Sequence, residues 1–207
     1  MPPVPPVEAS GWVTRFLPLR AARVETDAHT LTGYPIVFHS LSQDLGGFKE
    51  RILPEAVDRT LRAGTNVDAL LDHRRETSHI LGSTDSGLLR LTKDREGLKV
   101  RITPPDTTAV RDAITVIQAG LVKGMSFAFR VWPDGAEWDD EDGIFVRTIK
   151  DMEFSEVSIV VNPAYLDTQI SARNAAVDAA ALAEYRAQAW RPSLAFRTRQ
   201  VRAGRRF

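Results

Sequence analysis

From residue 67 to residue 161 the sequence is a succession of short apolar stretches, separated by turn residues such as Asp85-Ser86-Gly87. Within several of these stretches apolar and polar residues alternate, which is the period of a β-strand because successive side chains point to opposite faces. Glycine, aspartate and proline between the stretches are typical of turns. The pattern therefore predicts many short strands, with too few helices between them for a doubly wound parallel sheet.

We expect strands at nine places along the chain: 30–38, 48–53, 67–71, 80–84, 88–92, 98–102, 125–131, 145–152 and 154–161. The first of them contains Pro35, which cannot donate a hydrogen bond to a neighbouring strand, so this strand lies at a sheet edge or carries a bulge. The acidic stretch from Trp132 to Gly143 is expected to be a loop.

Two predicted helices interrupt the strands. Pro54 opens the first, which runs to Leu61, near the position where helices tolerate proline best. In the second, apolar residues recur three and four positions apart before Gly120 ends the helix: Val110, Ile114 and Ile117. The predicted fold class is therefore α+β, a curled antiparallel-rich sheet or small β-barrel with a few flanking helices.

Both ends of the chain differ from this body. Residues 1–19 begin with prolines and are expected to form an extended arm. Residues 173–207 contain eight arginines and two acidic residues, a balance of +6. The whole chain has 27 basic and 27 acidic residues, so residues 1–172 have 19 and 25, a balance of −6. We expect an acidic domain at 20–172 and a basic, alanine- and arginine-rich tail with a helix at 175–190.

The chain has no cysteine, which excludes a thiol nucleophile, a disulfide framework and a cysteine-ligated zinc or iron–sulfur centre. Catalysis would depend on serine, threonine, histidine, acidic residues, lysine or tyrosine. No apolar run approaches the roughly 18 residues of a membrane span, and no signal-peptide core follows the N-terminus. We therefore expect a soluble, intracellular protein.

The candidates for a general base are four histidines: His29, His39, His73 and His79. Of these, His73 is the most interesting, because an apolar strand ends beside it and side chains at a strand end can face a cleft. The alternative is a surface histidine in a turn. Asp72, His73 and His79 could also ligate a metal, but their spacing matches no helical ligand pair and no third ligand is near, so no metal site is expected.

Ser126 is the lone serine of an apolar strand. Strand alternation places Met125, Phe127 and Phe129 on one face and Ser126 with Ala128 on the other, where small side chains leave room beside the hydroxyl. Ser126 is then either a nucleophile or a strand serine bonded to a neighbouring group.

Glu156 lies within a strongly apolar strand, on the same side as Ser158 and Val160. Burying an ionised carboxylate is costly unless it is paired. A compensating partner is therefore expected: an arginine if the residue is structural, an imidazole if it is catalytic.

Together, Ser126, His73 and Glu156 are the ingredients of a nucleophile, a base and an orienting carboxylate. Their order along the chain is His, Ser, Glu, which differs from the familiar protease folds. Glu153 and Asp72 compete with Glu156 for the third role.

Seven segments follow one another between about Val24 and Ala172: 33–38, 48–52, 70–73 (LLDH), 81–84, 120–129 (with GMSFAF), 154–160 (FSEVSIV) and 162–165 (NPAY). In order and spacing this set resembles the prohead maturation proteases of tailed bacteriophages. By position, His73 and Ser126 match the histidine and the serine of that family. Glu156 matches the acidic residue before its Val-Ser pair.

The resemblance implies a serine endopeptidase with a Ser-His-Glu triad and a fold related to the herpesvirus assemblins. It implies cleavage of scaffold and capsid-protein precursors, and of the protease itself, inside the assembling procapsid in the host cytoplasm. The residues themselves lead us to expect no cofactor, no metal and no membrane, and a homo-oligomer stays open. Nucleic acid is not an expected partner, except of the basic tail.

Two other functions compete with the protease. In a non-catalytic scaffold or capsid-associated module, Ser126 and Glu156 would be packing residues. In a nucleic-acid-binding module, the arginine-rich tail would contact phosphates. The acidic body and the lack of an aromatic stacking platform in its strand pattern argue against the latter.

Overall fold

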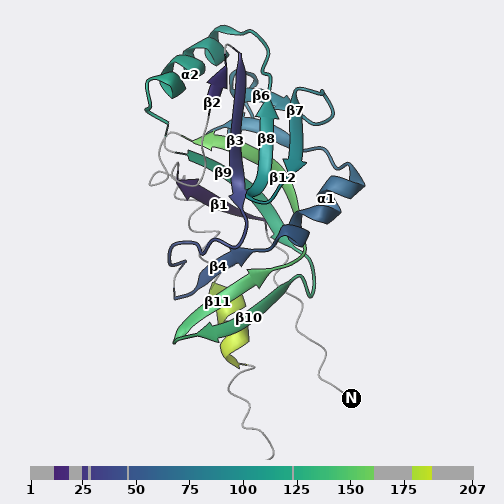
Figure 1. Ribbon diagram of the computed structural model, residues 1–207, viewed down its shortest axis with the longest axis vertical. Helices are drawn as coiled ribbons and strands as arrows, with labels where there is room; N and C mark the ends of the chain where they lie inside the picture. The colour runs from purple at the N-terminus through teal and green to yellow at the C-terminus, as the bar shows by residue number, and fades with distance from the viewer. Residues whose placement is uncertain are drawn as a thin grey trace, which may run out of the picture.

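The computed structural model describes residues 12–18, 25–27, 29–45, 47–122, 124–160 and 179–187. Their strands form a five-stranded, a four-stranded and a three-stranded sheet (Figure 1). Seven of the nine strand pairings are antiparallel. The prediction of an antiparallel-rich α+β fold is confirmed. Among the described strands the sheets stay separate, and none closes into a barrel.

The five-stranded sheet carries the predicted site residues. Its strands, in spatial order, are β1 (Val13–Pro18), β9 (Gly124–Val131), β12 (Met152–Val160), β5 (Asp68–Leu71) and β6 (Ile80–Ser83). β9 runs antiparallel to both β1 and β12, whereas β5 runs parallel to β12. The strand β1 falls within the segment expected to be an extended arm, so regular structure begins earlier than the sequence indicates.

The four-stranded sheet covers one face of the first. Its order is β2 (Glu25–Asp27), β3 (Thr30–Val37), β8 (Gly97–Ile102) and β7 (Leu89–Lys93). β3 pairs on both sides, and its register with β8 shifts between Gly33 and Ile36. Pro35 therefore lies at a bulge, one of the two predicted places. At Gly97 a Cβ would lie 2.0 Å from the Ile36 carbonyl oxygen, so only glycine fits against the bulge.

The main core lies between these two sheets. Phe127 and Phe129, which alternation in β9 places on one face, are fully buried together with Phe154 of β12, and the three belong to one cluster with Leu98 and Val100 of β8. The helix α2 (Thr108–Gln118) buries the three predicted apolar positions against it. Thr107 caps α2, because its hydroxyl accepts a hydrogen bond from the Val110 amide.

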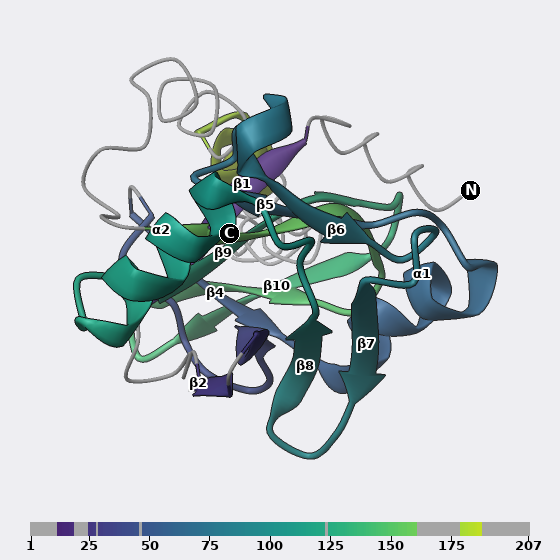
Figure 2. The same cartoon turned by 90° about the horizontal axis from the view of Figure 1, so that it is seen from above.

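Short helical elements complete the body. The 3₁₀ turn η1 (Pro54–Val57) leads into α1 (Asp58–Ala63) at the predicted place, and a second 3₁₀ turn, η2 (Thr77–His79), precedes β6. α1 and α2 lie on opposite sides of the body (Figure 2). Of the helices that the structure describes, none has the length and apolar character needed to cross a membrane.

The predicted acidic loop is wrong in its second half. The three-stranded sheet contains β10 (Ala136–Glu141), β11 (Ile144–Ile149) and β4 (Lys49–Ile52). Asp142 and Gly143 have φ of 54° and 80°, which is the Asp-Gly turn of a tight hairpin. The acidic side chains of β10 stay outside the core, where Glu137 pairs with Lys150 and Glu141 with Arg51.

A helix at 179–187, within the predicted helix 175–190, packs on this hairpin (Figure 1). Its Ala181 and Leu182 are buried. Tyr185 stacks on Trp138 with ring centroids 5.4 Å apart and meets the edge of Phe145 at the same centroid distance. Part of the segment assigned from sequence to a basic tail therefore contributes to the folded body.

A buried charge cluster joins the five-stranded and the three-stranded sheets. Arg15 of β1 donates to both carboxylate oxygens of Glu50 in β4, at 2.8 and 3.2 Å. Arg147 of β11 reaches the same carboxylate at 3.6 Å. All three side chains are buried, so the single carboxylate of Glu50 is a shared counter-charge for two guanidinium groups that are largely shielded from water. The cluster ties β1 to the three-stranded sheet.

Replacing Glu50 by glutamine is expected to lower the free energy of unfolding by about 3–5 kcal/mol, because two buried arginines lose a shared, buried counter-charge. Urea unfolding followed by circular dichroism measures this. Glu137→Gln removes the ion pair with Lys150 at the surface and is expected to cost less than about 1 kcal/mol. Equal losses in the two variants would contradict a structural role for the cluster.

Candidate active site

His73 is presented by a strained turn at the end of β5. Asp72 and His73 have φ of 47° and 59°, and the Arg74 amide donates to the Leu71 carbonyl at 3.0 Å. Two consecutive residues with positive φ and this hydrogen bond define a type I′ turn, which usually contains asparagine and glycine. Each non-glycine residue there costs about 1–2 kcal/mol, and such strain is typical of functional sites.

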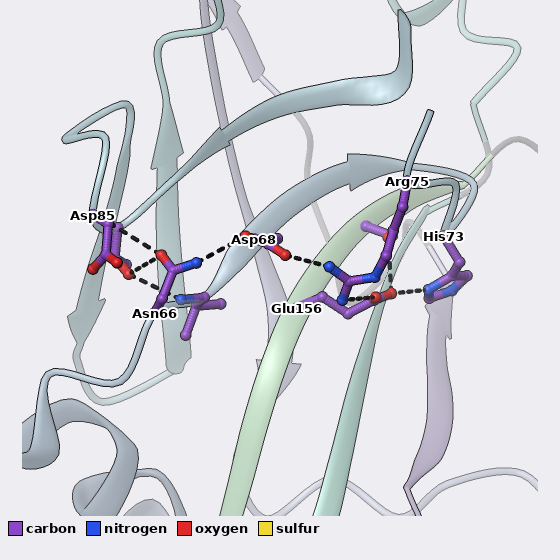
Figure 3. A network of polar contacts seen from close by, with 9 residues as sticks. Asn66, Asp68, His73, Arg75, Asp85 and Glu156 are labelled. Carbon is purple, nitrogen blue, oxygen red and sulfur yellow. Dashed lines mark hydrogen bonds and ion pairs between the residues drawn. The ribbon is translucent and has the colours of Figure 1, made fainter. Parts of the chain in front are cut away.

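Glu156 of β12 contacts both of the partners expected as alternatives from the sequence, an imidazole and an arginine. The imidazole Nδ1 of His73 contacts one carboxylate oxygen, Oε1. The guanidinium Nη2 of Arg75 donates to the other, Oε2, at 3.1 Å (Figure 3). The side chains of His73 and Glu156 are only 7% and 8% exposed, so little water weakens this contact.

The network continues away from His73 along β5. Arg75 also donates to Asp68, the residue directly opposite Glu156 in the parallel pair of β5 and β12. Asn66 in turn donates to Asp68 at 3.0 Å and accepts from the Asp85 amide at 3.2 Å (Figure 3). The Glu156 carboxylate is thus held from both sides by a chain of polar contacts.

The second ring nitrogen of His73, Nε2, is buried and has no hydrogen-bond partner among the described residues. A carboxylate only accepts hydrogen bonds, so its contact assigns the proton of a neutral imidazole to Nδ1. Nε2 then carries a lone pair. A neutral imidazole fixed in this tautomer can take a proton from a neighbouring donor.

Ser126 lies on the same face of the sheet as Glu156, on the neighbouring strand β9. It is directly opposite Ser158 in the antiparallel pair of β9 and β12, which places their Cβ atoms about 4.5–5.5 Å apart. The Ser158 hydroxyl donates to Oε1 of Glu156 at 3.4 Å. Ser126 and Ser158 are both fully buried.

The Ser126 hydroxyl has another partner in this conformation. It donates to the main-chain carbonyl of Arg15 in β1 at 2.7 Å. The structure therefore brings His73 and Glu156 into contact and places Ser126 on the same sheet face, opposite Ser158, with its hydrogen bond directed to the edge strand.

The other candidates lie apart from this contact. Glu153 is paired with Arg130 at 2.8 Å, and Asp72 is exposed in the turn. His79 contacts the Ser78 hydroxyl at 2.8 Å. No group of three or more histidine and acidic side chains is arranged to hold a metal ion in the part of the chain that the structure describes.

Sequence reasoning missed three groups at this site: the Arg75 guanidinium, the Ser158 hydroxyl and the Arg15 carbonyl. Arg75 had a signal, because Glu156 needs a cation and two arginines follow His73 directly. Ser158 had one too, since alternation places it beside Glu156. The Arg15 carbonyl had none, because a main-chain acceptor is available at every residue.

The model of the caudovirus prohead serine protease family matches residues 17–182, which is more than half of the chain and includes His73, Ser126 and Glu156. The chain belongs to the caudovirus prohead serine protease family. The resemblance seen in the sequence is thereby confirmed, and with it the role of a phage procapsid protease. No curated protein matches the chain, and no solved structure does.

The family match places the prohead protease among the peptide-bond hydrolases. It starts at residue 17, within β1, so the greater part of this strand, including Arg15, precedes the matched stretch. The polar network of Figure 3 lies entirely inside that stretch.

Proposed function

We propose that this prohead protease is a serine endopeptidase in which Ser126 is the nucleophile, His73 the general base and Glu156 the residue that orients the imidazole. The observation that carries the proposal is the buried contact of His73 with Glu156, which leaves Nε2 without a partner on the face that holds Ser126. This is the division of roles that a serine protease requires.

In the proposed reaction the Ser126 hydroxyl leaves the Arg15 carbonyl and bonds to Nε2 of His73. The serine oxygen attacks the scissile carbonyl carbon while its proton moves to Nε2. The imidazolium then returns this proton to the leaving amine, the C–N bond breaks, and an acyl-enzyme remains. Water repeats the sequence, with His73 again taking and returning a proton, and releases the acid.

Glu156 contributes to both halves of this reaction. It holds the proton of neutral His73 on Nδ1, so that Nε2 faces the nucleophile, and its negative charge stabilises the imidazolium that forms. Every step is supplied by side chains of this protein and water. The proposal includes no cofactor.

The proposed substrates are the scaffold and capsid-protein precursors, together with the protease itself, inside the assembling procapsid. The family match supports a procapsid role in general, and these partners are its specific extension. We propose also that the curled five-stranded sheet is related to the fold of the herpesvirus assemblins, as the sequence resemblance implies.

One observation favours a second candidate function. Ser126 is fully buried and donates to a main-chain carbonyl, which is what a packing serine in a non-catalytic scaffold module would do. The two candidates differ in a measurable way, because a scaffold tolerates loss of this hydroxyl.

Ser126→Ala is expected to reduce cleavage about 10⁶-fold, and His73→Ala by a similar factor, because nucleophile and base act as a unit. The measurement is co-expression with the capsid-protein precursor, followed by mass analysis of the assembled shells. Ser155→Ala, which removes a hydroxyl from the residue before Glu156, is the matched control and should leave cleavage intact. Cleavage above a few per cent in Ser126→Ala or His73→Ala would rule the mechanism out, and absence of cleavage by the unaltered protein would favour the scaffold function.

Glu156→Gln is expected to slow cleavage about 10⁴-fold without abolishing it, because the amide can hold the wrong imidazole tautomer. Asp72→Asn tests the competing carboxylate beside His73 and is expected to keep most of the activity. The rate of precursor cleavage in both variants decides between them. If Asp72→Asn cleaves the precursor far more slowly than normal while Glu156→Gln cleaves it at a near-normal rate, the orienting role belongs to Asp72.

A further inference from the structure

Arg75 occupies a place at this site that the proposed mechanism does not use. It follows His73 by two residues, and its guanidinium spans from Asp68 to Glu156 (Figure 3). The two oxygens of Glu156 are divided between two partners, since Oε1 contacts the imidazole and Oε2 accepts from Arg75. Rotation of the carboxylate away from His73 would break both contacts at once.

The charges near His73 show what this guanidinium does. Glu156 on β12 and Asp68 on β5 are negative, Arg75 is positive, and the turn itself adds Asp72 and Arg74. Arg74 directs its guanidinium to His79, at 3.4 Å. From β9 the site receives only the neutral hydroxyl of Ser126.

Without Arg75, the carboxylates of Glu156 and Asp68 would act on the imidazole with no guanidinium paired to them. Nearby negative charge favours the protonated form of a histidine, and a nearby positive charge opposes it. A protonated imidazole has no lone pair on Nε2 and cannot act as a base. The position of Arg75 on Oε2 therefore matters for the charge state of His73, although the two side chains are joined only through Glu156.

We propose that Arg75 is a positioning residue of the protease: it fixes the carboxylate of Glu156 against His73 and keeps the imidazole neutral at the pH of the reaction. The proposal rests on the function proposed above. The Arg75 side chain is 59% exposed, so water can take the place of its guanidinium and Arg75→Gln is expected to fold.

The first test needs no catalysis. The imidazole signals of the full chain are titrated by NMR in a Ser126→Ala background, and His73→Ala in that background identifies the His73 signal. With Arg75→Gln the titration midpoint of His73 is expected to move up by about one pH unit. Asp68→Asn is expected to move it in the opposite direction, and Arg75→Lys to restore most of the original midpoint.

Arg74→Gln is the matched control, because it removes the same charge from the adjacent residue, whose guanidinium faces His79. It is expected to move the His73 midpoint by less than a third of the shift in Arg75→Gln. An unmoved midpoint in Arg75→Gln, or equal shifts in the two arginine variants, would overturn the proposal. Thermal unfolding of each variant shows whether it folds. If Arg75→Gln does not fold, the titration relies on Arg75→Lys, which keeps the positive charge.

The second test measures cleavage of a capsid-derived substrate with Ser126 intact. In Arg75→Gln the acidic limb of the pH–activity profile is expected to move to higher pH, with kcat down about tenfold below the midpoint and KM nearly unchanged, since about ten times fewer imidazoles are neutral there. Arg75→Lys should recover most of kcat.

The two tests separate failure of this proposal from failure of the proposed function. A normal pH profile and kcat in Arg75→Gln, with Ser126→Ala inactive, would overturn the role of Arg75 and leave the triad in place. An active Ser126→Ala protein would overturn the triad, and the role of Arg75 in catalysis with it.

Discussion

The buried carboxylate of Glu156 is the constraint on which the site depends. An ionised carboxylate in an apolar strand costs several kcal/mol unless cations and hydrogen-bond donors surround it. His73, Arg75 and Ser158 surround it here, and two of these come from the chain that follows β5. The parallel pairing of β5 with β12 brings that chain to Glu156, and the strained turn at Asp72 and His73 directs the imidazole onto it.

The proposed nucleophile depends on a different element. Ser126 shares a sheet face with Glu156, but its hydroxyl donates to β1, the edge strand that Glu50 holds through Arg15. The arginine that fixes β1 in the core and the carbonyl that accepts from Ser126 belong to the same residue. The buried charge cluster and the candidate active site are thus linked through Arg15, and the proposed reaction requires that this serine hydrogen bond change its partner.

Much of this arrangement follows from the sequence, and the remainder has physical reasons. Alternation in β9 and β12 was enough to place Ser126 and Glu156, and the cost of burying Glu156 was enough to require a cation or an imidazole. The sequence alone could not show that an arginine and an imidazole are both present at Glu156, because the pairing of strands depends on contacts distant in sequence. β10 was missed since its acidic residues look like a loop, although Asp142-Gly143 is a hairpin signal. β1 was missed because the prolines at the N-terminus dominate that region.

The central claim is that His73, held by Glu156, activates Ser126. Labelling with a fluorophosphonate, which reacts with activated serines, followed by peptide mass mapping tests it most directly. The account predicts one labelled peptide, the one that contains Ser126, and loss of the label in His73→Ala. A label on another serine, or labelling of Ser126 that persists when His73 is replaced, would contradict it.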